Sequence, residues 1–170
     1  MVTKLQGAII AAGRGERLRI STHDDIPKPL VDLGGEAMLS RQARAMIDAG
    51  ADSVVAVINT ETARVAGEMG LEIPTSIRLV VRDTANSMET MLALGDLLEP
   101  GWFIASTVDA VIPQNEMVRF VNESRRKIEE CGDKSMLGVL AVTRWRGETK
   151  PRAARNSLRV RTAGSRRPRR

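Results

Sequence analysis

Short apolar runs alternate with stretches of helical periodicity from the N-terminus to about Thr143. Apolar runs of roughly four to eight residues that are bounded by turn residues are typical of buried strands. Such runs predict five strands, at Leu5–Ala11, Ser53–Asn59, Ile77–Arg82, Trp102–Val108 and Met136–Val142.

Helices are predicted where apolar residues recur every three or four positions. The helix at Ala37–Ala49 is followed by Gly50, a common stop signal. The others are expected at Thr62–Met69, around the stripe of Met88, Met91, Leu92 and Leu98, and at Glu116–Glu130, with Met117, Phe120, Val121 and Ile128 inward. The alternation predicts an α/β domain whose mainly parallel sheet is covered by helices on both faces.

This pattern stops after Pro151. Met1–Thr143 carries 15 Lys+Arg and 20 Asp+Glu, a net charge of −5, whereas Arg144–Arg170 carries 11 basic residues and one acidic residue, a net charge of +10. Residues 151–170 contain eight Arg and few large aliphatic side chains. We expect residues 1–150 to form the domain and residues 151–170 to be a basic, disordered tail.

The basic tail leaves nucleic-acid binding through phosphate neutralisation open. The sequence has only two Phe and two Trp residues to stack on bases, which argues against a dedicated single-strand binder. No apolar run reaches the roughly 18 residues that a membrane-spanning helix needs. The single cysteine, Cys131, allows no disulfide within the chain, and we expect a cytoplasmic protein.

A glycine-containing loop directly follows the first predicted strand, with the sequence Ala-Ala-Gly-Arg-Gly-Glu-Arg-Leu at positions 11–18. Glycines let successive backbone N–H groups turn toward an anion, and Arg14 and Arg17 add positive charge. The loop is therefore a candidate phosphate site, although a tight strand-to-helix turn would have the same pattern. It lacks the Gly-Lys-Ser/Thr of a P-loop and the third glycine of the dinucleotide fingerprint, but a dinucleotide-binding domain stays open.

A second candidate is Pro27-Lys28-Pro29-Leu30. Two prolines restrict the backbone and fix the direction of Lys28, as suits a lysine that must meet a phosphate. Taken alone, such a segment is usually just a surface loop, and it gains weight only in combination with the glycine-containing loop.

Together, these two segments resemble the nucleotidyltransferase superfamily, whose members join an NTP to a phosphorylated sugar, a choline-type alcohol or a cofactor with loss of pyrophosphate. The family's opening pattern is met over Ile9–Gly50 by the strand, Ala-Ala-Gly-x-Gly-x-Arg-Leu, Pro-Lys-Pro-Leu and a helix that ends in Ala-Gly. The resemblance implies the three-layer Rossmann-like fold of nucleotide-diphospho-sugar transferases, here incomplete at the C-terminus.

The resemblance also implies roles for individual residues. Three groups would hold the nucleotide: the backbone of Ala11, Ala12 and Gly13 for the base and ribose, Gly15, Arg17 and Lys28 for the phosphates, and Asp83, Asn86 and Ser87 for the base or acceptor. Arg17 and Lys28 would also act catalytically by stabilising charge as pyrophosphate departs. Asn86, with Glu89 three residues later, is equally well explained as a helix N-cap.

Asp109 follows the predicted strand Trp102–Val108, and ligands of open α/β sheets lie at the carboxyl ends of strands. In the family this position is a metal ligand, which implies that Asp109 binds Mg²⁺ and is the third catalytic residue. The family more usually has Gly before that Asp, whereas this sequence has Val108. The alternative is that Asp109 is an ordinary loop carboxylate or a helix cap. His23 and Cys131 have no partner that would make a metal or nucleophilic site.

We therefore predict an Mg²⁺-dependent nucleotidyltransferase that uses an NTP and a phosphorylated acceptor, with sugar 1-phosphate as the first choice and phosphocholine-like acceptors and molybdopterin open. The alternative is a non-catalytic nucleotide-binding remnant. The resemblance covers Leu5–Thr143, extending at most to Lys150, and family members continue further, with a second metal-binding Asp. The shift to Arg-rich composition leads us to expect a truncated or frame-shifted C-terminal segment.

Overall fold

The computed structural model describes residues 4–13, 26–71, 74–131, 136–142 and 159–164. These fall into two compact units, Met1–Gln114 and Asn115–Arg170, each of which is described by itself. No helix in the described ranges is both long and apolar enough to cross a bilayer.

The first unit contains a parallel four-stranded sheet with the strand order β3-β2-β1-β4. Its strands are β1 (Leu5–Ala11), β2 (Ser53–Ile58), β3 (Ile77–Val81) and β4 (Trp102–Thr107). The two central strands, β1 and β2, are buried along almost their whole length. Their continuous apolar runs are therefore those of a sheet covered on both faces, as the sequence predicted.

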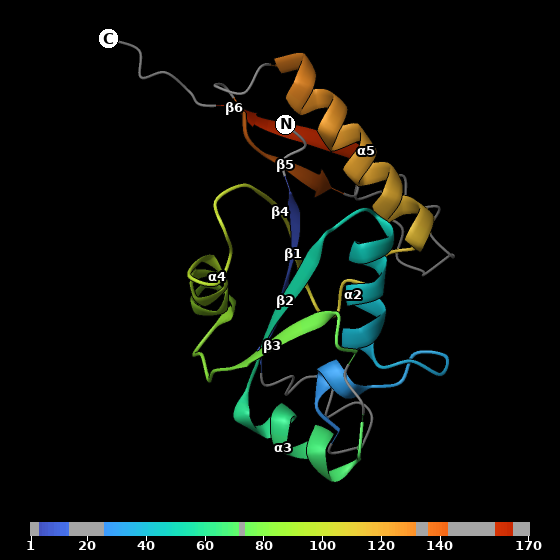
Figure 1. Ribbon diagram of the computed structural model, residues 1–170, viewed down its shortest axis with the longest axis vertical. Helices are drawn as coiled ribbons and strands as arrows, with labels where there is room; N and C mark the ends of the chain where they lie inside the picture. Colours follow the sequence, from blue (N-terminus) through green and yellow to red (C-terminus); the bar gives the residue numbers. More distant parts are fainter. Residues whose placement is uncertain (1–3, 14–25, 72–73, 132–135, 143–158, 165–170) are drawn as a thin grey trace, which may run out of the picture. The chain divides into compact units, whose positions relative to one another are not determined.

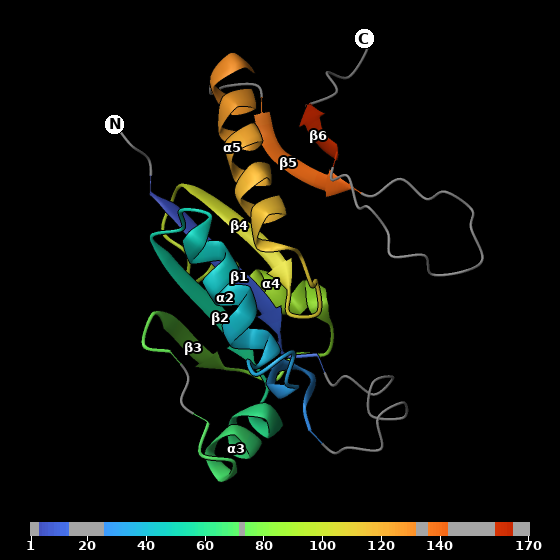
Figure 2. The same cartoon turned by 90° about the vertical axis from the view of Figure 1, so that its right-hand side faces the viewer.

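Helices α2 (Met38–Asp48) and α4 (Ser87–Gly95) lie on opposite sides of this sheet, as Figures 1 and 2 show. Helix α4 buries Ala93 and Leu94 in a cluster with Ala8, Val55 and Val57. The short 3₁₀ helix η1 (Lys28–Leu30) and helix α3 (Thr60–Glu68) follow the carboxyl ends of β1 and β2. The predicted α/β layers are thus confirmed for this unit.

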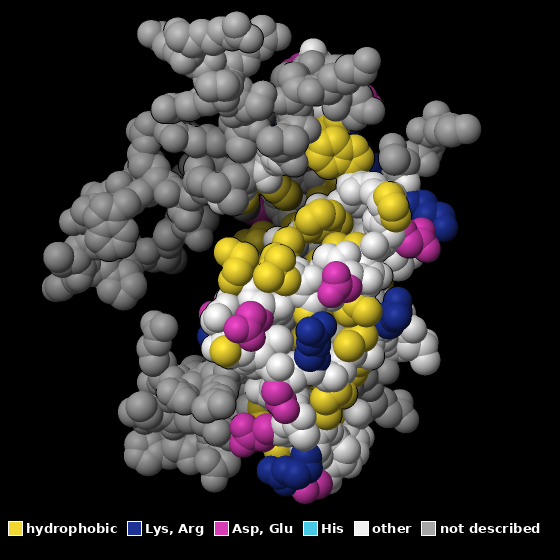
Figure 3. Space-filling model, turned by 90° about the vertical axis from the view of Figure 1, so that its left-hand side faces the viewer, with side chains coloured by type: hydrophobic (Ala, Val, Ile, Leu, Met, Phe, Trp, Pro, Cys, Tyr) yellow, Lys and Arg dark blue, Asp and Glu magenta, His cyan; other side chains and the backbone are white. Residues whose placement is uncertain are grey.

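Helix α4 differs from the prediction in the face that it buries. Met88 and Leu92, expected in an apolar stripe, are 68% and 65% exposed, and Leu98 lies beyond the helix. Apolar side chains gather on the face that α4 presents in Figure 3. The expectation was wrong because α4 carries apolar residues in several directions, so that their spacing alone did not identify the inward side.

The second unit contains most of α5 (Gln114–Cys131) together with β5 (Met136–Val142) and β6 (Arg159–Gly164). Strand β5 was expected as a fifth strand of the layered domain, but it pairs antiparallel with β6 in a separate two-stranded sheet. Strand β6 lies within the segment for which the sequence predicted a disordered tail. The expectation of disorder was wrong for these six residues, which form a strand. The other residues of 151–170 lie outside the described part of the chain.

Candidate functional site

The strand order brings the predicted site residues to one edge of the sheet. From β1 the chain builds β2 and β3 on one side and then returns to place β4 on the other side of β1. In open α/β sheets, the carboxyl ends of the two strands at such a reversal form the usual ligand site. Ala12 and Gly13 follow β1 at this point, and Asp109 follows β4 shortly after its end.

Lys28 is positioned by the two prolines beside it. Pro27, Pro29 and Leu30 are buried, and the N–H of Leu30 donates to the carbonyl of Pro27 over 2.8 Å. The backbone of η1 is therefore anchored against the domain, while the Lys28 side chain remains partly exposed. The predicted role of the prolines in directing this lysine agrees with this arrangement.

Asp109 is positioned by the turn that ends β4. The N–H of Val108 donates to the carbonyl of Ile10 over 3.1 Å, which joins the end of β4 to β1. The N–H of Ala110 then donates to the carbonyl of Thr107 over 3.1 Å and closes the turn. The Asp109 carboxylate consequently lies at the reversal point between β1 and β4.

Lys28 and Asp109 form an ion pair across 81 residues of sequence. Lys28 Nζ lies 2.6 Å from Asp109 Oδ2, and the two side chains are 28% and 43% exposed. The sequence predicted a role for each residue but not their direct contact, because neither motif indicates how far apart the two side chains lie in the fold. The structure thus unites two of the three predicted catalytic residues.

The Asp109 carboxyl is held in its charged form. The hydrogen bond from Lys28 lowers its pKa below the ordinary value, and the Thr107 side chain and the charge of Lys28 act in the same direction against partial desolvation. Because the pKa is lowered, the carboxylate is ionised at neutral and mildly acidic pH. Its stabilising contribution is lost only as the pH falls through that lowered pKa.

Asn59 joins the end of β2 to the candidate nucleotide loop. Its Nδ2 donates to the carbonyl of Ala12 over 3.2 Å, and its Oδ1 accepts from the N–H of Thr62 over 2.7 Å as the N-cap of α3. The side chain is buried. Sequence reasoning placed Asn59 in a strand and missed this role, although an Asn between a strand and a helix is a recognisable cap signal.

Asp83, a predicted nucleotide contact, binds the first turn of α3. Its Oδ1 accepts from the N–H of Thr60 over 2.9 Å, and its Oδ2 accepts from the Thr60 hydroxyl over 2.7 Å. Asp83 follows β3, so that its contacts connect the carboxyl ends of β3 and β2. The observed contacts are structural, and a contact to nucleotide stays a prediction.

Asn86 is the N-cap of α4, which confirms one of its two predicted explanations. Its Oδ1 accepts from the N–H groups of Met88 and Glu89, both over 3.0 Å, and Glu89 Oε2 accepts from the N–H of Ala85 over 2.8 Å. Ser87 is the exposed first residue of the helix. The roles of Asn86 and Ser87 in ligand binding stay predictions.

The rest of the predicted loop is described only in part. Ala11 and Ala12 are buried at the end of β1, and Gly13 is exposed, with open space where a Cβ would stand. Gly15 and Arg17, predicted to bind triphosphate, lie outside the described residues.

The donor set at this edge fits a divalent cation that arrives with phosphate ligands. The described residues include no group of three or more His, Cys, Asp or Glu that could hold a metal ion. Mg²⁺ is commonly bound by one or two carboxylates together with substrate phosphates and water. Asp109 supplies a carboxylate of this kind beside the candidate phosphate loop.

A comparison with known domain families matches residues 7–163 to the MobA-like NTP transferase domain. The match includes every predicted site residue. It also extends past Lys150, where the resemblance was expected to end, into the Arg-rich segment.

Curated relatives match most of the chain at moderate identity. The bifunctional enzyme IspD/IspF of Brucella anthropi is 33% identical over 147 residues, which are 84% of this chain and 34% of that protein. A mannose-1-phosphate guanyltransferase of Gibberella zeae is 27% identical over 150 residues, which are 80% of this chain and 40% of that protein. The chain therefore spans well under two thirds of the length of these relatives.

Solved structures show the same fold at lower identity. A nucleotidyl transferase from Methanothermobacter has a TM-score of 0.58 and 17% identity, covering 70% of this chain and 57% of its own. Rv0371c from Mycobacterium tuberculosis has a TM-score of 0.55 and 18% identity, covering 83% of this chain and 66% of its own. These matches agree with the Rossmann-like layers described above.

Proposed function

Because the chain belongs to the family of MobA-like NTP transferase domains, we propose that it transfers an NMP group from an NTP to a phosphorylated acceptor. In this reaction an oxygen of the acceptor phosphate bonds to the α-phosphorus of the NTP. The bond from that phosphorus to the bridging oxygen of the β-phosphate breaks, and pyrophosphate leaves. The observation that carries the proposal is the meeting of Lys28 and Asp109, 2.6 Å apart, beside the loop that follows β1.

Each of these groups suits one part of the reaction. The ammonium of Lys28 stabilises the negative charge that grows on the leaving phosphates, and the backbone at Ala12 and Gly13 positions the nucleotide. Asn59 holds the Ala12 carbonyl in place from the neighbouring strand. Charge stabilisation and positioning are the main contributions that a protein makes to transfer at phosphorus.

We assign the divalent cation to Asp109, with Mg²⁺ as the expected ion. When bound, such a cation neutralises phosphate charge and orients the nucleotide. A manganese complex of the structural neighbour Rv0371c has been solved, which supports a divalent ion in this fold. The Asp109 carboxylate is ionised at neutral pH and is therefore in the form that binds a cation.

We propose a sugar 1-phosphate as the acceptor. The mannose-1-phosphate guanyltransferase among the relatives supports this choice by its name. A relative from Rhodococcus jostii is named 2-C-methyl-D-erythritol 4-phosphate cytidylyltransferase, which keeps other phosphorylated alcohols open. The base of the NTP depends on the backbone of the loop after β1, and a panel of NTPs identifies it.

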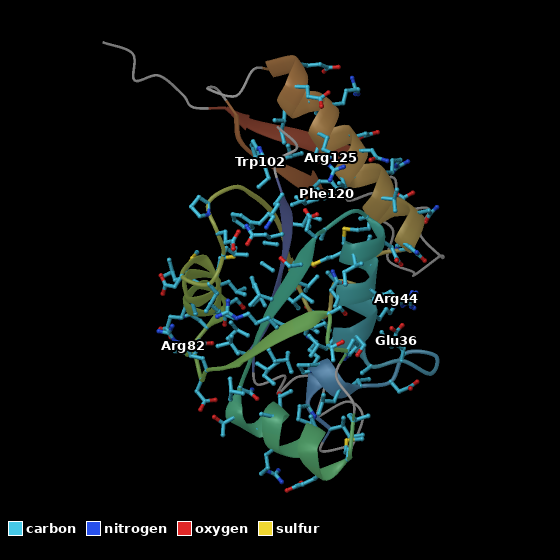
Figure 4. The ribbon with its side chains drawn as sticks, viewed as in Figure 1. Glu36, Arg44, Arg82, Trp102, Phe120 and Arg125 are labelled. Carbon is cyan, nitrogen blue, oxygen red and sulfur yellow. The ribbon has the colours of Figure 1, made fainter. Side chains whose placement is uncertain are left out.

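Pyrophosphate release tests the proposed function. The full chain is assayed with each of the four common NTPs, Mg²⁺ and a panel of sugar 1-phosphates. We expect turnover with one NTP, and we expect Lys28→Ala and Asp109→Ala each to lower it at least about a hundredfold. Arg82→Ala is the matched control, because Arg82 is exposed after β3 and points away from the sheet in Figure 4. Full turnover in either site variant would contradict the assignment, and NTP binding without turnover would favour the non-catalytic alternative.

A further inference from the structure

Lys28 and the proposed metal ion require the same carboxylate. Lys28 Nζ is 2.6 Å from Asp109 Oδ2, so a cation on either oxygen of this carboxylate would lie close to the ammonium charge. Both partners are presented by anchored backbone, Lys28 between the buried Pro27 and Pro29 and Asp109 in the turn after β4. The fold therefore brings the two side chains within hydrogen-bonding distance of each other.

A divalent cation without nucleotide has little else to bind in the described part of this edge. No group of three or more potential ligands is present there, so a bare cation would gain the Asp109 carboxylate and water. It would do so against the repulsion of the Lys28 ammonium, which already forms a short, charge-assisted hydrogen bond with this carboxylate. The side chain of Lys28 is 28% exposed, and leaving the carboxylate would cost it this partner.

A triphosphate changes this competition. Its oxygens are acceptors for the Lys28 ammonium and are also ligands for the cation. If Lys28 turned to a phosphate, the repulsion at Asp109 would fall, and the carboxylate would hold the cation together with the phosphate oxygens.

On the basis of the proposed function, we propose that Lys28 is the resident counter-cation of Asp109 in the nucleotide-free protein. The NTP and the divalent cation then bind with positive coupling, because the nucleotide withdraws Lys28 from this carboxylate. Lys28 then has opposite effects on two ligands. It weakens binding of the cation alone and strengthens binding of the nucleotide. Coupling of this kind is reciprocal, so that the cation strengthens nucleotide binding by the same factor.

The test measures the binding of Mn²⁺ to the full chain in the absence of nucleotide. The electron paramagnetic resonance signal of free Mn²⁺ monitors this binding. Lys28→Met removes the competing charge and keeps an unbranched apolar stem. We expect it to bind Mn²⁺ more tightly than the wild type, by up to about fivefold, the size of effect that an exposed ion pair usually has. Arg82→Met removes one positive charge at the same edge of the sheet, but at the end of β3, which two strands separate from β4, and should leave Mn²⁺ affinity unchanged. Adding Asp109→Asn to Lys28→Met should abolish the gain.

A second titration follows an NTP in the presence of Mn²⁺, where we expect Lys28→Met to bind more weakly than the wild type. Unchanged or weaker Mn²⁺ binding by Lys28→Met, or an equal gain in Arg82→Met, would overturn the inference. Failure of the wild type to bind any NTP would instead refute the proposed function, since the comparison of Mn²⁺ affinities needs no nucleotide. The melting temperature of each variant shows that it is folded.

Discussion

At the scale of single residues, polar side chains at the ends of strands hold the backbone of the site together. Asn59 binds the Ala12 carbonyl and caps α3, and Asp83 binds both the N–H and the hydroxyl of Thr60. The carboxyl ends of β1, β2 and β3 are thereby linked side by side. The candidate nucleotide loop thus begins from backbone that these hydrogen bonds hold without any ligand.

The two functions of Asn59 can be separated by substitution. Asn59→Ser keeps a short side-chain acceptor for the N–H of Thr62 but cannot reach Ala12, so we expect the free energy of unfolding to fall by about 1–3 kcal/mol for the lost buried hydrogen bond. Asn59→Ala loses the cap as well, and we expect a further loss of about 1 kcal/mol. Urea denaturation measures both values. Equal stabilities of Asn59→Ser and the wild type would show that the contact with Ala12 contributes nothing.

The sequence predicted individual residues better than their partners. Lys28 and Asp109 were both singled out from the motif around each, and they meet in the structure. Asn59 was missed because a cap signal is common to many helices and does not reveal a contact with a residue 47 positions away. Contacts of this length depend on the strand order, which no local pattern contains.

At the scale of elements, α4 shows a start that the sequence predicted and a buried face that it did not. The start is chemical, because Asn86 supplies an acceptor for two otherwise unpaired N–H groups. The buried face depends on packing, and the helix offers apolar side chains on both sides. Thr90, Ala93 and Leu94 are buried, while Met88 and Leu92 are exposed.

The cap of α4 can be tested with a matched pair of variants. Asn86→Ala removes the acceptor, and we expect a loss of about 1 kcal/mol in the free energy of unfolding. Asn86→Asp keeps the acceptor and adds a negative charge near the positive end of the helix dipole, so its stability should stay within about 0.5 kcal/mol of the wild type. Thermal and urea unfolding give both values. A loss of the same size in the two variants would contradict the cap. A nucleotide titration of the folded Asn86→Asp variant then tests the predicted ligand role separately.

At the scale of the whole molecule, the layered first unit was predictable, whereas the partner of β5 was not. Apolar runs alternating with helical periodicity indicate a parallel sheet, because parallel strands need covered faces and crossover helices. The pairing of β5 with β6 joins segments on either side of residues 143–158, and the composition of the Arg-rich segment gave no sign of a strand. Composition predicts whether a segment can build a core, but not whether it can pair through its backbone.

The close packing of the layers depends on the absence of a side chain at Gly7. A Cβ at this position in β1 would lie 2.9 Å from Met46 Sδ of α2 and 2.9 Å from Val54 Cγ2 of β2. We expect Gly7→Ala to lower the free energy of unfolding by about 1–3 kcal/mol through overpacking. Gly67→Ala is the control, since a Cβ in α3 meets nothing within 4 Å and should stabilise the protein by about 0.4–1 kcal/mol. Urea unfolding compares the two, and a stable Gly7→Ala would show that α2 is not packed as described.

The most direct test of the central claim is thermal melting of the full chain and of Lys28→Met with each NTP, in the presence of Mg²⁺. A ligand that binds only the native state stabilises it by about 2.7 kcal/mol at a hundredfold excess over Kd. The account predicts that one NTP raises the melting temperature of the wild type and that the same NTP raises that of Lys28→Met by less. No increase with any NTP, or an equal increase in both proteins, would contradict an NTP site built on Lys28 and Asp109.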